Sequence, residues 1–143
     1  MSDSELMQLY SRRILALAAD IPHLGRLSEG APSGYKRSPQ CGSSVTVDVI
    51  MNGDQISEFA QEIRACALGQ ASAAILGQHV IGCTRAEISQ ARDALIAMLQ
   101  NQGPAPEGKF SALETLLPAR DFPNRHASIL LVWDATLAAI DAA

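Results

Sequence analysis

The feature that most constrains the fold is a valine-rich segment that alternates in character and ends at a turn. Valine occupies every second position from 45 to 49, with Thr46 and Asp48 between, which is the pattern of a strand with one buried face. An Asn-Gly pair follows at 52–53, and both central positions of a type I′ turn need the positive φ that this pair tolerates. Residues 55–63 then return as a second strand. The sequence therefore predicts an antiparallel hairpin.

Before and after this hairpin in the sequence, apolar residues recur at helical spacing. Thr84 and Glu87 have the spacing of a capping box, and Asn124 is a good N-cap for the last helix. The Gly- and Pro-rich segment 20–40 is predicted as loop with a short strand at 34–37. The predicted helices cover 3–19, 66–79, 85–100, 111–117 and 124–140. We expect an α+β fold, in which a small antiparallel sheet of about three strands packs against four to five helices in a single domain, 1–143.

The bulk properties exclude several classes of protein. The chain has 143 residues and a formal net charge of -4, without a basic stripe, which argues against nucleic-acid binding. A run of about 18 apolar residues, as a membrane span requires, is missing, and the first five residues are acidic rather than signal-like. We therefore expect a cytoplasmic protein with neither nucleic acid nor membrane as partner. In a reducing compartment the three cysteines would remain thiols.

Two cysteines and one histidine carry the chemistry that the sequence offers. Cys41 precedes the valine-rich strand, and Cys66 lies where strand character gives way to helix. A thiol at a helix N-terminus is exposed to the positive end of the helix dipole, which favours its thiolate. His126 adds an imidazole at the start of the last helix. Thiolates and imidazole suit zinc or iron–sulfur chemistry. The alternative is that the cysteines are small buried residues of a relict site, and that His126 packs beside Leu130.

The remaining polar residues invite structural interpretations. Cys83 would lie at the far end of the helix that begins at Cys66, and we expect a structural role for it. Trp133 falls on the apolar stripe of the last helix and is predicted to lie in the core. Asp48 and Glu58, on opposite arms of the hairpin, are interpreted as a cross-strand surface feature rather than an acid–base pair. No catalytic triad order, phosphate loop or paired-carboxylate motif stands out, so no catalytic residues are predicted.

The two cysteine motifs together resemble a known family. Pro39-x-Cys41-Gly42, the hairpin, and Cys66-Ala67-x-x-Gln70-Ala71-Ser72-Ala73 are similar in order and spacing to the U-type iron–sulfur cluster scaffolds, the NifU N-terminal-like and IscU-like proteins. Members are α+β proteins that receive sulfur from a cysteine desulfurase, build a [2Fe–2S] cluster and pass it to acceptor proteins. Some bind zinc at the same site. The resemblance implies the same partners here, and a monomer or homodimer.

This sequence departs from the family pattern at two positions. The family has a Cys-Gly-Asp motif and a third cysteine at the start of the last helix. Here the aspartate position is Ser43 and the third cysteine position is Ala127, with His126 retained before it. The resemblance implies Cys41, Cys66 and His126 as metal ligands, with a fourth from outside or from a second subunit. Ser43 would tune cluster lability, and Arg125, with Lys36 or Arg37, would supply positive charge near the site unless these residues simply face solvent.

Three functions are compatible with these residues. The first is an iron–sulfur cluster scaffold or carrier that binds iron or a [2Fe–2S] cluster. The second is a zinc-binding or degenerate family member that acts through protein interaction, because three ligands plus water satisfy tetrahedral zinc. The third is a thiol enzyme acting through Cys66, which the absence of an accompanying catalytic base makes the weakest. The sequence favours an atypical scaffold that is not an enzyme.

Overall fold

Three antiparallel strands form one sheet in the order β1-β2-β3, in which β2 and β3 are the two arms of a hairpin. The computed structural model describes residues 10–39 and 42–143. The strands are β1 (Ser33–Arg37), β2 (Ser44–Asn52) and β3 (Gln55–Arg64). The predicted hairpin is confirmed, but its two turn residues are Gly53 and Asp54, since Asn52 still pairs with Gln55. Only Gly53 of these two has a positive φ, 63°, which excludes the predicted type I′ turn.

Helices occupy most of the rest of the described chain. They are α2 (Arg12–Ala18), α3 (Ala67–His79), α4 (Arg85–Gln100) and α5 (His126–Asp141), with 3₁₀ segments η1 (Gly108–Asp121) and η2 (Pro123–Arg125). The capping box of Thr84 and Glu87 is present and begins α4 as predicted. Asn124 is not the N-cap of the last helix: it lies inside η2, and the cap is Arg125, which makes no side-chain cap bond. The predicted helix at 3–19 is described only from residue 10. No described helix has the length and apolar character needed to cross a membrane.

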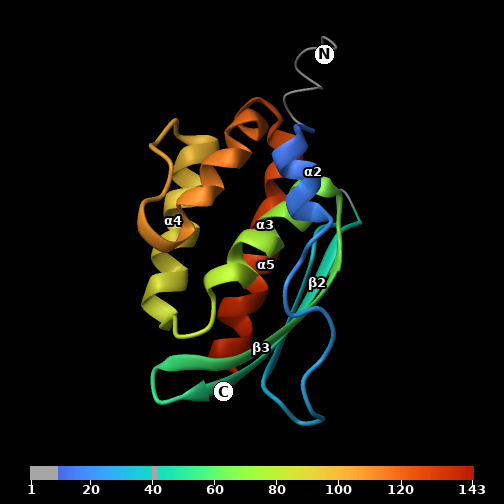
Figure 1. Cartoon of the computed structure of the whole chain (residues 1–143), viewed down its shortest axis with the longest axis vertical. Coiled ribbons are helices and arrows are strands. Elements are labelled where there is room, and N and C mark those ends of the chain that lie inside the picture. Colours follow the sequence, from blue (N-terminus) through green and yellow to red (C-terminus); the bar gives the residue numbers. More distant parts are fainter. Residues whose placement is uncertain (1–9, 40–41) are drawn as a thin grey trace.

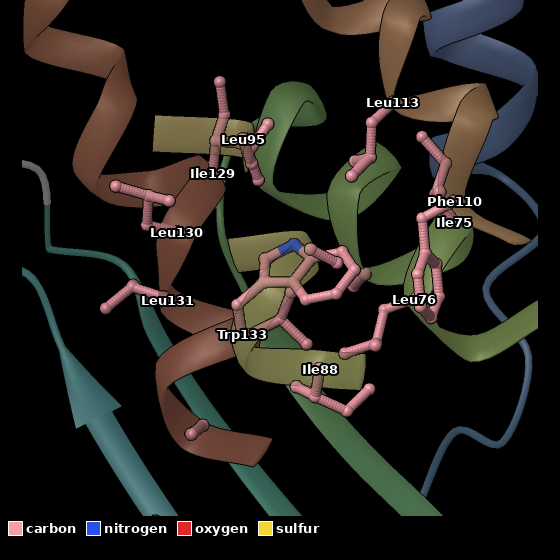
Figure 2. Close-up of a cluster of buried hydrophobic side chains, with 14 of the residues drawn as sticks. Ile75, Leu76, Ile88, Leu95, Phe110, Leu113, Ile129, Leu130, Leu131 and Trp133 are labelled. Atoms are coloured by element: carbon pink, nitrogen blue, oxygen red, sulfur yellow. The ribbon is translucent and has the colours of Figure 1, made fainter. Parts of the chain in front are cut away.

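Helix α5 is the central element, between the sheet on one side and α4 on the other (Figure 1). Gly34 in β1 permits the sheet to approach closely, because a Cβ there would collide with the backbone of α5 at Ala135. Trp133 is fully buried, as predicted, among aliphatic side chains from α3, α4 and α5 (Figure 2). Its indole Nε1 donates a hydrogen bond to Ser72 Oγ at 3.0 Å. This packing joins α3 to α5 along their length and so fixes the beginnings of both helices.

Asp48 is a buried anchor and not the surface feature that the sequence suggested. Its side chain is nearly inaccessible, and Glu58 lies opposite Ile50 rather than opposite Asp48. Arg26 Nε and Nη2 donate to the two carboxylate oxygens of Asp48 at 2.8 and 3.1 Å. Burial alone would raise the pKa of Asp48, but hydrogen bonds from Arg26, Ser33 and a backbone N–H outweigh it, and its pKa lies below the ordinary value. The pair fastens the 20–32 loop onto the sheet.

Candidate metal centre

Cys66 lies at the junction between β3 and α3 and is the N-cap residue of that helix. Its backbone is extended, with φ -67° and ψ 172°, and its side chain makes no capping hydrogen bond. The thiol is therefore not committed to the helix backbone. It is half-buried, and its Sγ lies 3.6 Å from Ser128 Oγ in the first turn of α5. A partly accessible thiol at a helix N-terminus is the environment in which cysteines bind metals or react.

A short chain of hydroxyl groups connects the Cys66 thiol to Ser43. Ser128 Oγ lies 3.1 Å from Ser43 Oγ and also contacts Cys66 Sγ, and both serines are buried. A serine hydroxyl has one proton to donate and can accept as well, so Ser128 can donate to the sulfur while it accepts from Ser43. The structure thus brings Ser43 and Cys66 to one place through Ser128. The sequence analysis did not identify Ser128, whose only signal is a hydroxyl on an otherwise apolar helix face.

Gly69 explains how α5 comes so close to the Cys66 end of α3. A Cβ on Gly69 would lie 2.7 Å from Ser128 Oγ and 3.0 Å from the Ser128 carbonyl oxygen. Any larger residue at position 69 would push the two helices apart or force side chains out of place. The glycine therefore holds Ser128 within reach of the cysteine sulfur.

His126 is the first residue of α5 and is buried, with 5 % of its surface exposed. Its Nε2 lies 2.8 Å from the Ala119 carbonyl oxygen. Because a carbonyl can only accept, Nε2 carries a proton, and in the neutral ring Nδ1 is the nitrogen that has a lone pair for a metal. Within the described residues no hydrogen bond connects His126 to Cys66. The ring is oriented by the backbone of η1, an arrangement compatible with both a metal ligand and a packed helix-end histidine.

Cys41, which the sequence predicts as a metal ligand, lies outside the described residues. The described residues on either side are tied together: Gly42 N donates to the Ser38 carbonyl at 2.9 Å, and Ser38 N donates to the Ser43 carbonyl at 2.8 Å. Within 10–39 and 42–143, no three or more His, Cys, Asp or Glu side chains form a group that could hold a metal ion. A three-ligand site would thus depend on Cys41.

Three arginines lie at the ends of β1, β3 and η2, the elements that precede Cys41, Cys66 and His126 in the sequence. Arg37 ends β1, Arg64 ends β3, and both pair in register with Ser44 of β2, in one row across the sheet. Arg125 directly precedes His126. These three arginines form no ion pair with any residue in the part of the chain that the structure describes. The role of Arg125 in supplying charge near the site stays a prediction.

Cys83 lies beyond the opposite end of α3 and has a different environment. Its side chain is fully buried, and its thiol donates to the His79 carbonyl oxygen at 3.1 Å. Burial raises the pKa of Cys83, an effect that Lys109 opposes and Glu87 reinforces. A helix of 13 residues separates the two thiols, about 20 Å at 1.5 Å per residue. Cys83 is a core residue, as the sequence predicted.

Comparisons with known proteins point in one direction. No family model matches the sequence. An iron–sulfur cluster assembly scaffold protein IscU from Streptococcus pyogenes serotype M1 is 26 % identical over 140 residues, which is 98 % of this chain and 87 % of that protein. The N-terminal part of a nitrogen-fixing NifU-like protein from Brucella abortus has the same fold, with a TM-score of 0.93 and 41 % sequence identity over 96 % of both chains.

A third solved structure extends the likeness of fold. A protein from Fervidobacterium islandicum AW-1, described as an iron–sulfur cluster assembly scaffold for the SUF system, has a TM-score of 0.81. It covers 90 % of this chain and 94 % of its own, at 23 % identity. At that identity the match speaks only for the shared α+β architecture. The stronger Brucella match covers 96 % of this chain.

Proposed function

This chain belongs to the U-type iron–sulfur cluster scaffold family, and from that premise we propose that it holds an iron–sulfur cluster as cargo and passes it to acceptor proteins. The observation that carries the proposal is Cys66: a half-buried thiol at the N-cap of α3, with the Ser128 hydroxyl in contact with its sulfur. A hydrogen bond to a ligating sulfur stabilises the negative charge of a thiolate-bound cluster and tunes its reduction potential. Under this proposal the chain holds and transfers the cluster without catalysing a reaction, so the chain is not an enzyme.

The proposed ligands are the thiolates of Cys41 and Cys66 and Nδ1 of His126. The hydrogen bond from His126 Nε2 to the Ala119 carbonyl supports this assignment, since metal-binding histidines generally donate their other ring N–H to such an acceptor. A [2Fe–2S] cluster needs four ligands, so one must come from outside this set. Zinc at the same three residues, with water as the fourth ligand, would make the chain a zinc-binding relative instead.

The partners follow from the family. A cysteine desulfurase would supply sulfur, and apo-proteins that need clusters would accept the product. Ala127 removes the thiol at the start of α5, so sulfur must be delivered to Cys66 or Cys41, or as free sulfide. Ser43 replaces the family's carboxylate with a neutral hydroxyl that bonds to Ser128. The uncharged group leaves the site less negative, and we expect cluster release to be slower than with a carboxylate there.

Anaerobic reconstitution with ferrous iron and sulfide tests the proposal. The expected product is coloured, sensitive to oxygen, and contains iron and acid-labile sulfide in equal amounts. Cys66→Ala should abolish it, whereas Cys83→Ala should leave it intact and so controls for the loss of any thiol. Absence of a visible charge-transfer band in the parent protein would refute the scaffold function, and stoichiometric zinc alone would assign the chain to the zinc-binding class.

A further inference from the structure

The two edges of the sheet differ in what covers them. At the β3 edge, Leu24 forms a parallel bridge with Gln61. Nearer the hairpin turn, Thr84 forms an antiparallel bridge with Gln55 of the same strand. β1 is the other edge of the sheet, and nothing in residues 10–39 or 42–143 forms a bridge to its outer side. The outer side of β1 is therefore open.

The hydrogen bonds at the two ends of β1 show which of its backbone groups face outward. Just before the strand, Val49 N donates to the Pro32 carbonyl oxygen at 3.0 Å. Just after it, Ser38 N donates to the Ser43 carbonyl oxygen at 2.8 Å. Residues that bond to the neighbouring strand alternate with residues that do not, so positions 33, 35 and 37 direct their N–H and C=O groups away from β2. Within the described chain these groups form no backbone hydrogen bond to any other segment.

The side chains of β1 give this edge a positive charge. Gly34 faces α5, because a Cβ there would collide with the Ala135 carbonyl oxygen, and Lys36 shares that face by alternation. Tyr35 and Arg37 lie on the opposite face. All three of these larger side chains are exposed, and neither cation forms an ion pair with another described residue. The strand therefore carries two positive charges and no negative one.

A groove continues from the end of this edge. It has a volume of about 490 Å³ and lies between residues 37–39 and a face of α5 that carries Leu130, Leu131 and Asp134. Figure 2 shows both leucines projecting from α5 on the side away from the buried indole. The carboxylate in the lining, Asp134, is already paired with Arg92. A strand that pairs with β1 and runs past its end would therefore place alternate side chains on apolar surface.

We infer that the open edge of β1 binds an extended, acidic segment of a partner protein, which adds to the sheet as a fourth strand. Backbone hydrogen bonds to positions 33, 35 and 37 would hold the segment. Carboxylates on one of its faces would pair with Arg37, and apolar residues on its other face would lie on Leu130 and Leu131. A second copy of β1 is a poorer match, because it would add two positive charges to an edge that has no negative one. The docked segment would end beside His126, which also lines the groove.

A short peptide of alternating glutamate and valine is the probe, added to the metal-free protein and followed by NMR of the backbone amides. We expect a dissociation constant of about 1 mM that rises with added salt. Amide shifts should concentrate at positions 33, 35 and 37, and hydrogen exchange there should slow. The same peptide N-methylated at every residue keeps the charge but cannot donate backbone hydrogen bonds, and it should not bind. Equal affinity of the two peptides, or no binding of the first at about 10 mM, would overturn the inference.

Two substitutions at one position separate the backbone of the edge from its side chain. Tyr35→Pro removes an outward N–H that β2 does not use, and proline is tolerated at such edge positions. It should abolish binding of the glutamate–valine peptide, whereas Tyr35→Thr keeps the N–H and should bind like the parent. Equal binding by these two variants would overturn the inference. Should Tyr35→Pro fail to fold, the N-methylated peptide still decides the question on the parent protein.

The charge of the edge is tested by Arg37→Gln, which should weaken binding about threefold. Arg85→Gln is the matched control, because Arg85 is paired with Asp141 away from this edge. Equal weakening by both variants would contradict the role of Arg37. A dimer that forms without peptide and is abolished by Tyr35→Pro would assign the edge to a second copy and overturn the inference.

The docking edge needs no bound cluster, so its test is separate from that of the scaffold function. Tyr35→Pro should form a cluster in the same yield as the parent, since position 35 is not among the proposed ligands. Loss of peptide binding together with loss of the cluster in this variant would point to a damaged fold and contradict a role confined to docking.

Discussion

The two ends of α3 place the same side chain in opposite environments. At the N-terminal end, Cys66 is half-buried, contacts a hydroxyl and follows two residues after Arg64, which has no ion-pair partner in the described chain. Beyond the C-terminal end, Cys83 is fully buried and donates to a backbone carbonyl, and the nearby Lys109 is paired with Glu87. Figure 1 shows these ends at opposite corners of the helical layer. Surroundings, rather than residue type, decide which thiol can bind metal.

Selective alkylation gives the largest expected effect of this difference. Iodoacetamide should modify Cys66 in the native protein. Cys83 should react at about one hundredth of that rate or more slowly still, because its exposure requires the core to open. Mass spectrometry of peptides follows each site separately. In 8 M urea the two rates should converge. Equal labelling of Cys66 and Cys83 in the folded protein would break the comparison.

Glycine-to-alanine substitutions near each end of α3 sharpen the comparison between these two ends. Gly69→Ala places a Cβ against Ser128 and should cost about 2 kcal/mol of folding free energy through overpacking. It should also change the rate at which iodoacetamide modifies Cys66. Gly77→Ala is the matched variant, since its Cβ would approach the Gln61 amide at 2.9 Å. The Gln61 side chain is fully buried and its Nε2 donates to the Pro22 and Ala73 carbonyls, but alanine's helix preference offsets about 1 kcal/mol, so Gly77→Ala should cost less than Gly69→Ala. Urea denaturation measures both. A more damaging Gly77→Ala would contradict the assignment.

The Ser43 position tests the N-terminal end alone. Ser43→Asp adds a negative charge beside Ser128 and should speed cluster transfer to an acceptor severalfold, because the carboxylate makes the site more negative and competes for iron. Ser111→Asp, at an exposed position of η1, controls for added charge. Transfer can be followed by the visible spectrum of a ferredoxin acceptor. If Ser43→Asp and the parent transfer at the same rate, the tuning role of position 43 is wrong.

Alkaline pH should reveal the environment of Cys83, beyond the C-terminal end of α3, through a smaller effect on the free energy of unfolding. The folded protein raises the pKa of Cys83, so above the unfolded value near 9 the unfolded chain loses this proton while the folded chain keeps it. The unfolded state then binds fewer protons, and stability falls as pH rises toward the folded pKa. The free energy of unfolding should drop between pH 8 and pH 10 more in the parent than in Cys83→Ala. Parallel pH profiles would show that Cys83 makes no such contribution.

Local patterns in the sequence were enough to predict most of the fold. Alternating valines marked β2, and the capping box of Thr84 and Glu87 marked the start of α4, because both signals act within a few residues. The hairpin turn shifted by one residue because strand pairing extends to Asn52 and Gln55. Asn124 failed as a cap because Pro123 begins a 3₁₀ turn that includes Asn124, so that α5 starts only at His126.

Contacts between distant segments could not be predicted from such local sequence patterns. Asp48 receives Arg26 from a loop 22 positions away, and nothing in the strand pattern indicates that partner. Ser128 meets Ser43 across 85 positions and Cys66 across 62, so its place at the site appears only once α5 has packed against α3. The candidate ligands Cys66 and His126 were identified from their positions at helix starts and from the family motif, while their environments required the fold.

The most direct test of the account is the metal and acid-labile sulfide content of protein purified without oxygen, measured with its visible spectrum. We predict iron and sulfide in equal amounts in the parent and in Cys83→Ala, and neither in Cys66→Ala. Equal iron and sulfide in all three proteins would show that Cys66 does not hold the cluster and would contradict the account.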